Sequence, residues 1–324
     1  ARFRLGMFDP DEMVSYAQTP FEVNDSDAHR ALALRVARES IVLLKNNGIL
    51  PLSKDAGPIA VVGPNADDVE VLLGNYNGTP SRAVTPLAGI RAKLGPDARI
   101  RYAKACDVTG GTSFGMAEAD AVARRSKVVI ACVGLSQIVE GEEGASALAD
   151  RTGLGFPGVQ QELLETLHAS GSPLIVVLLN GSPVDLTWAE EHADAIVEAW
   201  YPGEEGGTAL ADVLFGDYSP AGRLPITFPK SLDQLPPFAD YDMQGRTYRF
   251  MTEEPLYPFG YGLSYTEFSY DDLKISRASG SGARGAGEGI RSGDTLRVSA
   301  QVTNTGGRAG DEVVQLYVSD VQAS

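Results

Sequence analysis

Carboxylate side chains are concentrated in a short stretch that follows a strongly apolar segment. Residues 128–133 predict a buried strand, and Glu140, Glu142 and Glu143 follow it, with Asp150-Arg151 a few residues later. Ligands of open α/β sheets bind beyond the carboxyl ends of the strands. Glycosidic bonds are hydrolysed by two carboxyl groups, one acting as acid/base and one as nucleophile or base. This loop is therefore a candidate for acid/base chemistry, although a solvated charge run would have the same composition.

The remaining motifs do not form a second catalytic or cofactor site. The segment VGPNA at 62–66 follows a strand but has neither the spaced glycines nor the Gly-Lys-Ser/Thr of nucleotide-binding loops. Gly181-Ser182-Pro183 lacks the pattern of a serine hydrolase elbow and is typical of a turn into a helix. His29, His168 and His192 lack metal-ligand spacing, so we expect neither a metal nor another cofactor.

The composition restricts the partners of the chain. The net charge of −16 argues against nucleic acid, whose phosphates require a basic face. Apolar runs are all too short to cross a bilayer, so we expect no membrane partner. Two cysteines cannot form a disulfide framework, and 324 residues are more than one ordinary core needs. We therefore expect two domains.

Strands and helices alternate through most of the chain. We predict a helix over 25–45, capped by Asp25 or Ser26 and ended by Asn46-Asn47-Gly48. Strands are predicted at 59–62, 100–103, 127–133, 174–179 and 195–199, and helices at 86–94, 115–124, 158–169, 185–191 and 205–215. Strands that are apolar on both faces and alternate with helices indicate an α/β fold, a mostly parallel sheet sandwiched by helices.

A second, all-β region is predicted near the end of the sequence. Residues 280–293 are rich in glycine and serine, which is typical of a flexible linker or loop. Alternating segments at 296–302 and 313–318, separated by the turn at 304–307, predict two strands. These strands are too few to bury two sheets, so we expect an incomplete all-β sandwich.

Six segments together resemble one known family. They are ARESIVLLKN at 37–46, VGPNA at 62–66, LGNYNG at 73–78, AWYPG at 199–203 with Gly206-Gly207, LFGDYSPAGRLP at 214–225, and PLYPFGYGLSY at 255–265. The chain in this respect is similar to the second domain of family 3 glycoside hydrolases, the β-glucosidases and β-xylosidases. The motifs extend over nearly all of residues 25 to 270, and their combination is highly specific.

The resemblance implies an enzyme of three parts: a barrel that carries an aspartate nucleophile, an α/β sandwich that lends the acid/base glutamate, and a fibronectin type III-like domain. Residues 1–24 would link to a barrel absent here, with 1–10 resembling its last helix. Residues 25–230 would form the sandwich, 231–268 an extended linker and 269–324 a partial fibronectin type III-like domain. The expected function is that of a retaining, exo-acting β-glycosidase, a β-xylosidase or β-glucosidase. The alternative is a non-catalytic carbohydrate-binding or scaffold protein.

The resemblance also implies roles for individual residues. In the family, the acid/base glutamate precedes an Asp-Arg pair, which places the role on Glu142 and leaves Glu140 and Glu143 as alternatives because residues 144–149 are extra. Tyr76, with Asn75 before it, would flank the leaving group of a β-linked oligosaccharide or aryl glycoside. Arg151 is the third candidate for substrate contact, although with Asp150 it is better suited to anchor the loop. Without the barrel and its nucleophile, the chain is expected to be inactive alone.

Overall fold

The computed structural model describes residues 1–111, 115–140, 151–277 and 295–319. The strands are β1 (Val42–Asn46), β2 (Ile59–Val62), β3 (Ile100–Ala103), β4 (Val128–Gly134), β5 (Leu174–Leu179), β6 (Ala195–Glu198), β7 (Phe268–Arg277) and β8 (Leu296–Asn304). The α-helices are α1 (Asp27–Ser40), α2 (Pro86–Leu94), α3 (Met116–Ala123), α4 (Gln160–Ala169), α5 (Thr187–His192), α6 (Gly206–Leu214) and α7 (Thr247–Phe250). Short 3₁₀ helices lie at Asp11–Met13, Ser15–Gln18, Phe21–Val23, Glu70–Leu72 and Leu232–Gln234.

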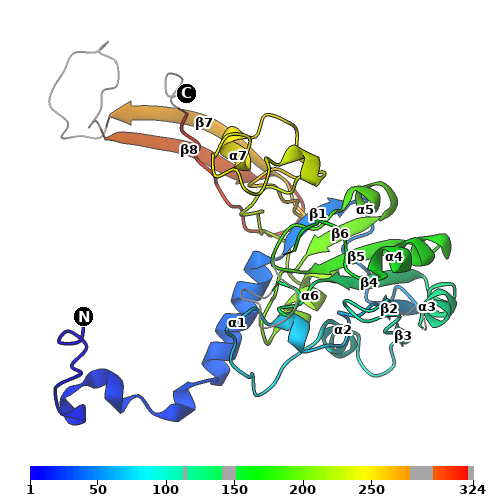
Figure 1. Cartoon of the computed structure of the whole chain (residues 1–324), viewed down its shortest axis with the longest axis horizontal. Helices are drawn as coiled ribbons and strands as arrows, with labels where there is room; N and C mark the ends of the chain where they lie inside the picture. Colours follow the sequence, from blue (N-terminus) through cyan, green and yellow to red (C-terminus); the bar gives the residue numbers. More distant parts are fainter. Residues whose placement is uncertain (112–114, 141–150, 278–294, 320–324) are drawn as a thin grey trace.

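Six strands form one sheet in the order β1-β6-β5-β4-β2-β3 (Figure 1). Strands β2 to β6 are parallel to their neighbours, whereas β1 pairs antiparallel with β6 at the edge. Helices α3, α4 and α5 pack on one face of the sheet, and α1, α2 and α6 pack on the other. Because both faces are covered, all residues of β4 and β5 are buried, which confirms the predicted α/β architecture.

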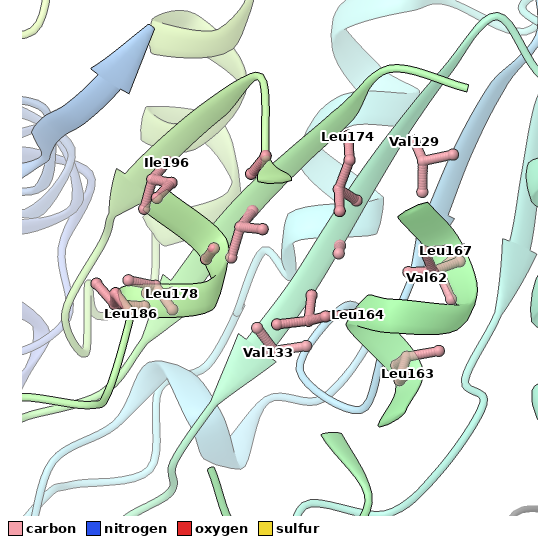
Figure 2. Close-up of a cluster of buried hydrophobic side chains, with 14 of the residues drawn as sticks. Val62, Val129, Val133, Leu163, Leu164, Leu167, Leu174, Leu178, Leu186 and Ile196 are labelled. Carbon is pink, nitrogen blue, oxygen red and sulfur yellow. The ribbon is translucent and has the colours of Figure 1, made fainter. Parts of the chain in front are cut away.

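The core alternates between these two faces along each central strand. Figure 2 shows Val129 and Val133 of β4 on the same side of the sheet as Leu163, Leu164 and Leu167 of α4. The residues between them, such as Ile130 and Cys132, belong to the cluster on the opposite face. The alternation follows from the two-residue period of a strand, and it explains why the sequence of a doubly covered strand is continuously apolar.

The first helix is shorter than the sequence predicts. Helix α1 ends at Ser40, and residues 42–46 form β1 instead of the last turn of a helix over 25–45. The segment from Ile41 to Leu44 is buried on every side, which suits a strand of a covered sheet better than an amphipathic helix. The N-cap prediction is confirmed, because the Ser26 hydroxyl accepts a hydrogen bond from the His29 amide.

A close approach joins β4 to β5 at their carboxyl ends. Gly134 has a φ of +137°, and a Cβ atom added to it would lie 2.2 Å from the Leu179 carbonyl oxygen. The Leu135 amide then donates to the same carbonyl at 2.8 Å. Only glycine fits this position, so the loop that leaves β4 is directed across the end of β5.

A second, two-stranded antiparallel sheet consists of β7 and β8. The predicted strand at 313–318 is wrong: residues 311–319 lie outside the strands, and β8 pairs with β7 instead. Isolated alternation does not produce a strand unless a neighbouring strand accepts its hydrogen bonds. Residues of 311–319 still contact the first domain, since Glu312 pairs with Arg223 at 2.6 Å. In the described ranges, no helix has the length and apolar character needed to span a membrane.

Candidate active site

Glu140 lies in a cradle of three hydrogen-bond donors. Its Oε2 atom accepts from the Gly181 amide at 2.7 Å and from the Tyr201 hydroxyl, and its Oε1 atom accepts from the Ser182 hydroxyl. Gly181 and Ser182 follow β5, and Tyr201 follows β6. The carboxyl ends of three neighbouring parallel strands therefore meet at one carboxylate, at the edge where open α/β sheets bind ligands.

The part of the β4 loop that the structure describes ends at this carboxylate. The amides of Val139 and Glu140 both donate to the Ser136 carbonyl, at 2.9 and 3.1 Å, which closes a tight turn. Glu142, Glu143 and Asp150 lie outside the described residues. The structure thus defines the two ends of the loop at Glu140 and Arg151.

Ser182 holds both ends of that loop. Its hydroxyl donates to Glu140 and accepts from Arg151 Nη1 at 2.9 Å. Arg151 also donates to the carbonyls of Pro183 and Gly155, at 3.2 and 3.3 Å. Among the described residues, Arg151 thus bonds to groups of the protein itself, and these bonds fix the segment where the loop ends. Burial lowers the pKa of Arg151, and the nearby charge of Glu140 acts in the opposite direction.

Tyr201 remains a hydrogen-bond donor throughout the neutral range. Burial is the main cause that raises the pKa of this phenol, and its hydrogen bond to the Glu140 carboxylate raises it further. The Tyr201 hydroxyl thus lies directly on the candidate site.

Asn75 and Tyr76 lie on a loop beside the same segment. The Asn75 side chain donates to the Glu140 carbonyl at 3.2 Å, and Asn77 donates to Gln137 Oε1 at 2.6 Å. Tyr76 has a φ of +60° and is 85% exposed. The two candidate residues are therefore brought next to the β4 loop, with the aromatic side chain presented to solvent.

A buried carboxyl group lies behind the cradle. Glu198, the last residue of β6, is fully buried, and its oxygens accept from the Trp200 amide at 2.9 Å and from Asn180 Nδ2 at 3.0 Å. Burial raises the pKa of Glu198 to about 8, against the two hydrogen bonds, which lower it. This residue is not among the site residues predicted from the sequence. The available signal was a lone acidic residue at the end of an otherwise apolar strand.

A cavity of about 770 Å³ adjoins the segment that begins at Arg151, where the loop ends. Arg151, Leu154 and Ser182 line it from the α/β domain, and Phe238 and Arg246 line it from the segment that follows. Its size is within the range of small-molecule sites. The described residues contain no group of three or more metal-ligating side chains.

Comparisons with known proteins agree on one family. The model of the glycosyl hydrolase family 3 C-terminal domain matches residues 41–265. A β-xylosidase of Formosa agariphila is 40% identical over 100% of this chain and 44% of its own length. A periplasmic β-glucosidase of Salmonella typhimurium is 38% identical over 100% of this chain and 45% of its own length. The chain thus spans about half the length of the curated relatives it matches.

Solved structures show the same relationship. An exo-β-xylosidase in complex with a xylobiose aziridine probe superposes with a TM-score of 0.76 at 33% identity, covering 84% of this chain and 36% of that chain. A β-glucosidase from Erythrobacter marinus superposes with a TM-score of 0.74 at 36% identity, covering 91% of this chain and 42% of its own.

Proposed function

This chain belongs to glycoside hydrolase family 3, and from that premise we propose that it is part of a retaining, exo-acting β-glycosidase, a β-xylosidase or β-glucosidase. The observation that carries the proposal is the clamp at Ser182, which holds Glu140 and Arg151 at the two ends of a carboxylate-rich loop. A loop with both ends fixed at the ligand-binding edge of the sheet is suited to present a side chain to a neighbouring domain.

The acid/base role is best assigned to Glu142. Three donors occupy both oxygens of Glu140, which makes Glu140 an anchor of the loop and leaves its carboxyl group turned toward the protein. An acid/base carboxyl group must instead reach the glycosidic oxygen of the substrate. Glu142 lies two residues beyond the anchor, and Glu143 is the alternative.

The complete reaction requires a second carboxylate. In a retaining glycosidase the two carboxyl groups are about 5 Å apart, one attacking the anomeric carbon while the other protonates the leaving oxygen. The acid then deprotonates the water that releases the sugar. We place the nucleophile on the barrel that residues 1–24 would follow, so that residues 25–230 supply the acid/base and the barrel supplies most contacts to the terminal sugar.

The substrate would be a β-linked oligosaccharide or an aryl glycoside. Asn75 is tied to the backbone of Glu140, and the exposed Tyr76 follows it, which would place an aromatic face beside the leaving group. Aromatic rings bind sugars through the apolar C–H faces of the sugar ring. Arg151 would contribute by fixing the loop and the wall of the adjacent cavity.

Activity of the complete enzyme tests the assignment. We expect Glu142→Ala to lower turnover of natural disaccharides by about 10²- to 10⁴-fold, because their leaving oxygen must be protonated. Activated nitrophenyl glycosides should be spared in the glycosylation step, and added azide should restore their turnover. The matched control is Glu143→Ala. If Glu143→Ala or Glu140→Ala shows the azide rescue instead, the assignment to Glu142 is wrong.

The isolated chain provides an independent test. It should not hydrolyse nitrophenyl β-xyloside or nitrophenyl β-glucoside, because it would lack the nucleophile. Release of nitrophenol by the purified chain would contradict the proposed division of the two carboxylates between domains. A complete protein that binds oligosaccharides without hydrolysing them would identify the alternative, a carbohydrate-binding protein of the same fold.

A further inference from the structure

Glu198 contacts both segments that hold Glu140. Through Oε2 it accepts from Asn180 Nδ2, and the same nitrogen donates to the Ser182 carbonyl at 2.9 Å. Asn180 thereby joins Glu198 to the turn at Gly181 and Ser182, and both of these residues donate to Glu140. Through Oε1 it accepts from the Trp200 amide, one residue before the tyrosine that supplies the third donor.

The Trp200 contact holds an unfavourable backbone conformation. Trp200 has a φ of +59°, which is in the left-handed region that bulky residues rarely adopt. Such a residue persists when its surroundings fix it. The carboxyl group of Glu198 does so at the amide, and the Ser40 carbonyl does so at the indole Nε1, at 3.0 Å.

We propose that Glu198 is a positioning residue that fixes the Asn180–Ser182 turn and the Trp200–Tyr201 segment, and thereby the place of Glu140 and of the loop that Glu140 anchors. Glu198 is fully buried and cannot reach a substrate. Its contacts instead support the three donors to Glu140 that the described residues contain. The consequence for catalysis rests on the proposed function, in which that loop carries the acid/base.

The protonation state of Glu198 determines whether Glu140 is the only negative charge of this cluster or one of two. Below pH 8 the Glu198 carboxyl group is neutral in the folded chain, because burial is the main cause that raises its pKa to about 8. The charge of Glu140 acts in the same direction, while the Trp200 amide and Asn180 oppose it. The other titratable groups of the cluster, Tyr201 and Arg151, interact with Glu140. Above pH 8 Glu198 carries a negative charge, which repels that of Glu140.

The two tryptophans make this arrangement directly measurable. Labelling the chain with ¹⁵N-tryptophan yields only two backbone amide signals, from Trp188 and Trp200. We expect the Trp200 amide to shift with a midpoint near pH 8, because its acceptor gains a charge there. The titration uses the unmodified chain, requires no activity, and is independent of the glycosidase assignment. A Trp200 amide that does not move between pH 6.5 and 9.5 would overturn the coupling.

Substitutions separate positioning from general stability. Glu198→Gln keeps the volume and an acceptor but cannot ionise, so the Trp200 signal should lose its titration while the exchange rate of the Gly181 amide should stay that of the wild type. Glu198→Leu removes the acceptors, and the amides of Gly181 and Glu140 should then exchange roughly tenfold faster or more by mass spectrometry. The matched control, Glu191→Gln on the exposed side of α5, should leave both readouts unchanged. Persistence of the Trp200 titration in Glu198→Gln, or unchanged Gly181 protection in folded Glu198→Leu, would refute the proposal.

Discussion

Strands β5 and β7 both pair with neighbouring strands, β7 with a register shift between Asp271 and Lys274, but their side chains have opposite surroundings. Every residue of β5 is buried, with helices on both faces of the sheet. In β7, Leu273 and Ile275 are 68% and 60% exposed. Strand pairing alone therefore does not bury the side chains of a strand here. The candidate site lies on the sheet whose strands are fixed from both sides, as a constellation requiring accurate placement should.

The two sheets should respond very differently to an added methyl group. Gly134→Ala would place Cβ against the Leu179 carbonyl at a φ of +137°, so we expect the free energy of unfolding to fall by about 4 kcal/mol. Gly307→Ala, after β8, meets no atom within 4 Å and should change it by less than about 0.5 kcal/mol. Urea denaturation measures both. Equal losses would show that the close approach of β4 and β5 is not needed.

Truncation of leucines compares burial in the two sheets. Leu178→Ala in β5 removes a fully buried side chain, and we expect a loss of about 3 kcal/mol, from transfer and from the cavity left behind. Leu273→Ala in β7 should cost less than about 0.5 kcal/mol. The midpoints of urea denaturation, compared at unchanged slope, provide the measurement. A large loss for Leu273→Ala would mean that the second sheet is covered in solution.

Much of the first sheet is predictable because its strands and helices follow local patterns. Helix α2 and strands β2, β3 and β5 begin and end at the predicted residues. Strands β2 and β5 are continuous apolar runs, and α2 has a clear cap and stop. The segment from Ile41 to Leu44 was missed because a buried edge strand and the end of a helix have the same apolar composition. Tertiary context determined the outcome there.

Only part of the candidate site can be predicted from the sequence. The carboxylate-rich loop is apparent, because it follows a buried strand. The residues that support this loop are not apparent from the sequence. Glu140 and Tyr201 are 61 residues apart and meet only because β4, β5 and β6 are parallel neighbours. Glu198 likewise has a role only once Asn180 and Trp200 are placed beside it. Residues 313–318 show the converse: they alternate as a strand would, but no strand in the described part of the chain pairs with them.

Buried and exposed carboxyl groups should give the two sheets different pH dependences. Glu198 is protonated when folded up to about pH 8 but ionises above its ordinary value of 4.5 when unfolded. Between these values the folded chain binds more protons, so this group's stabilisation, complete below pH 4.5, is lost as pH rises to 8. Glu198→Gln removes that loss, and we expect the free energy of unfolding of the variant to exceed that of the wild type at pH 9 and to equal it near pH 4.5.

The control for this pH dependence is the same change on an exposed glutamate beside the second sheet. Glu267→Gln should keep the wild-type pH dependence of unfolding between pH 4.5 and 9. Thermal unfolding at several pH values, with the ionic strength held constant, measures all three proteins. A wild-type slope retained in Glu198→Gln would assign the pH dependence to another group.

The smallest expected effect concerns single hydroxyl groups of the two sheets. Ser182→Ala removes the atom that links Glu140 to Arg151, and we expect a loss of about 1 kcal/mol because both partners remain half-buried. Ser269→Ala in β7 removes a solvent-exposed bond to Asp271 and should cost about 0.2 kcal/mol. A double-mutant cycle of Ser182→Ala with Glu140→Gln would show coupling of at least about 0.5 kcal/mol if the hydroxyl acts through that carboxylate. Additive losses would mean that Ser182 contributes only its own packing, and that the ends of the loop are held independently.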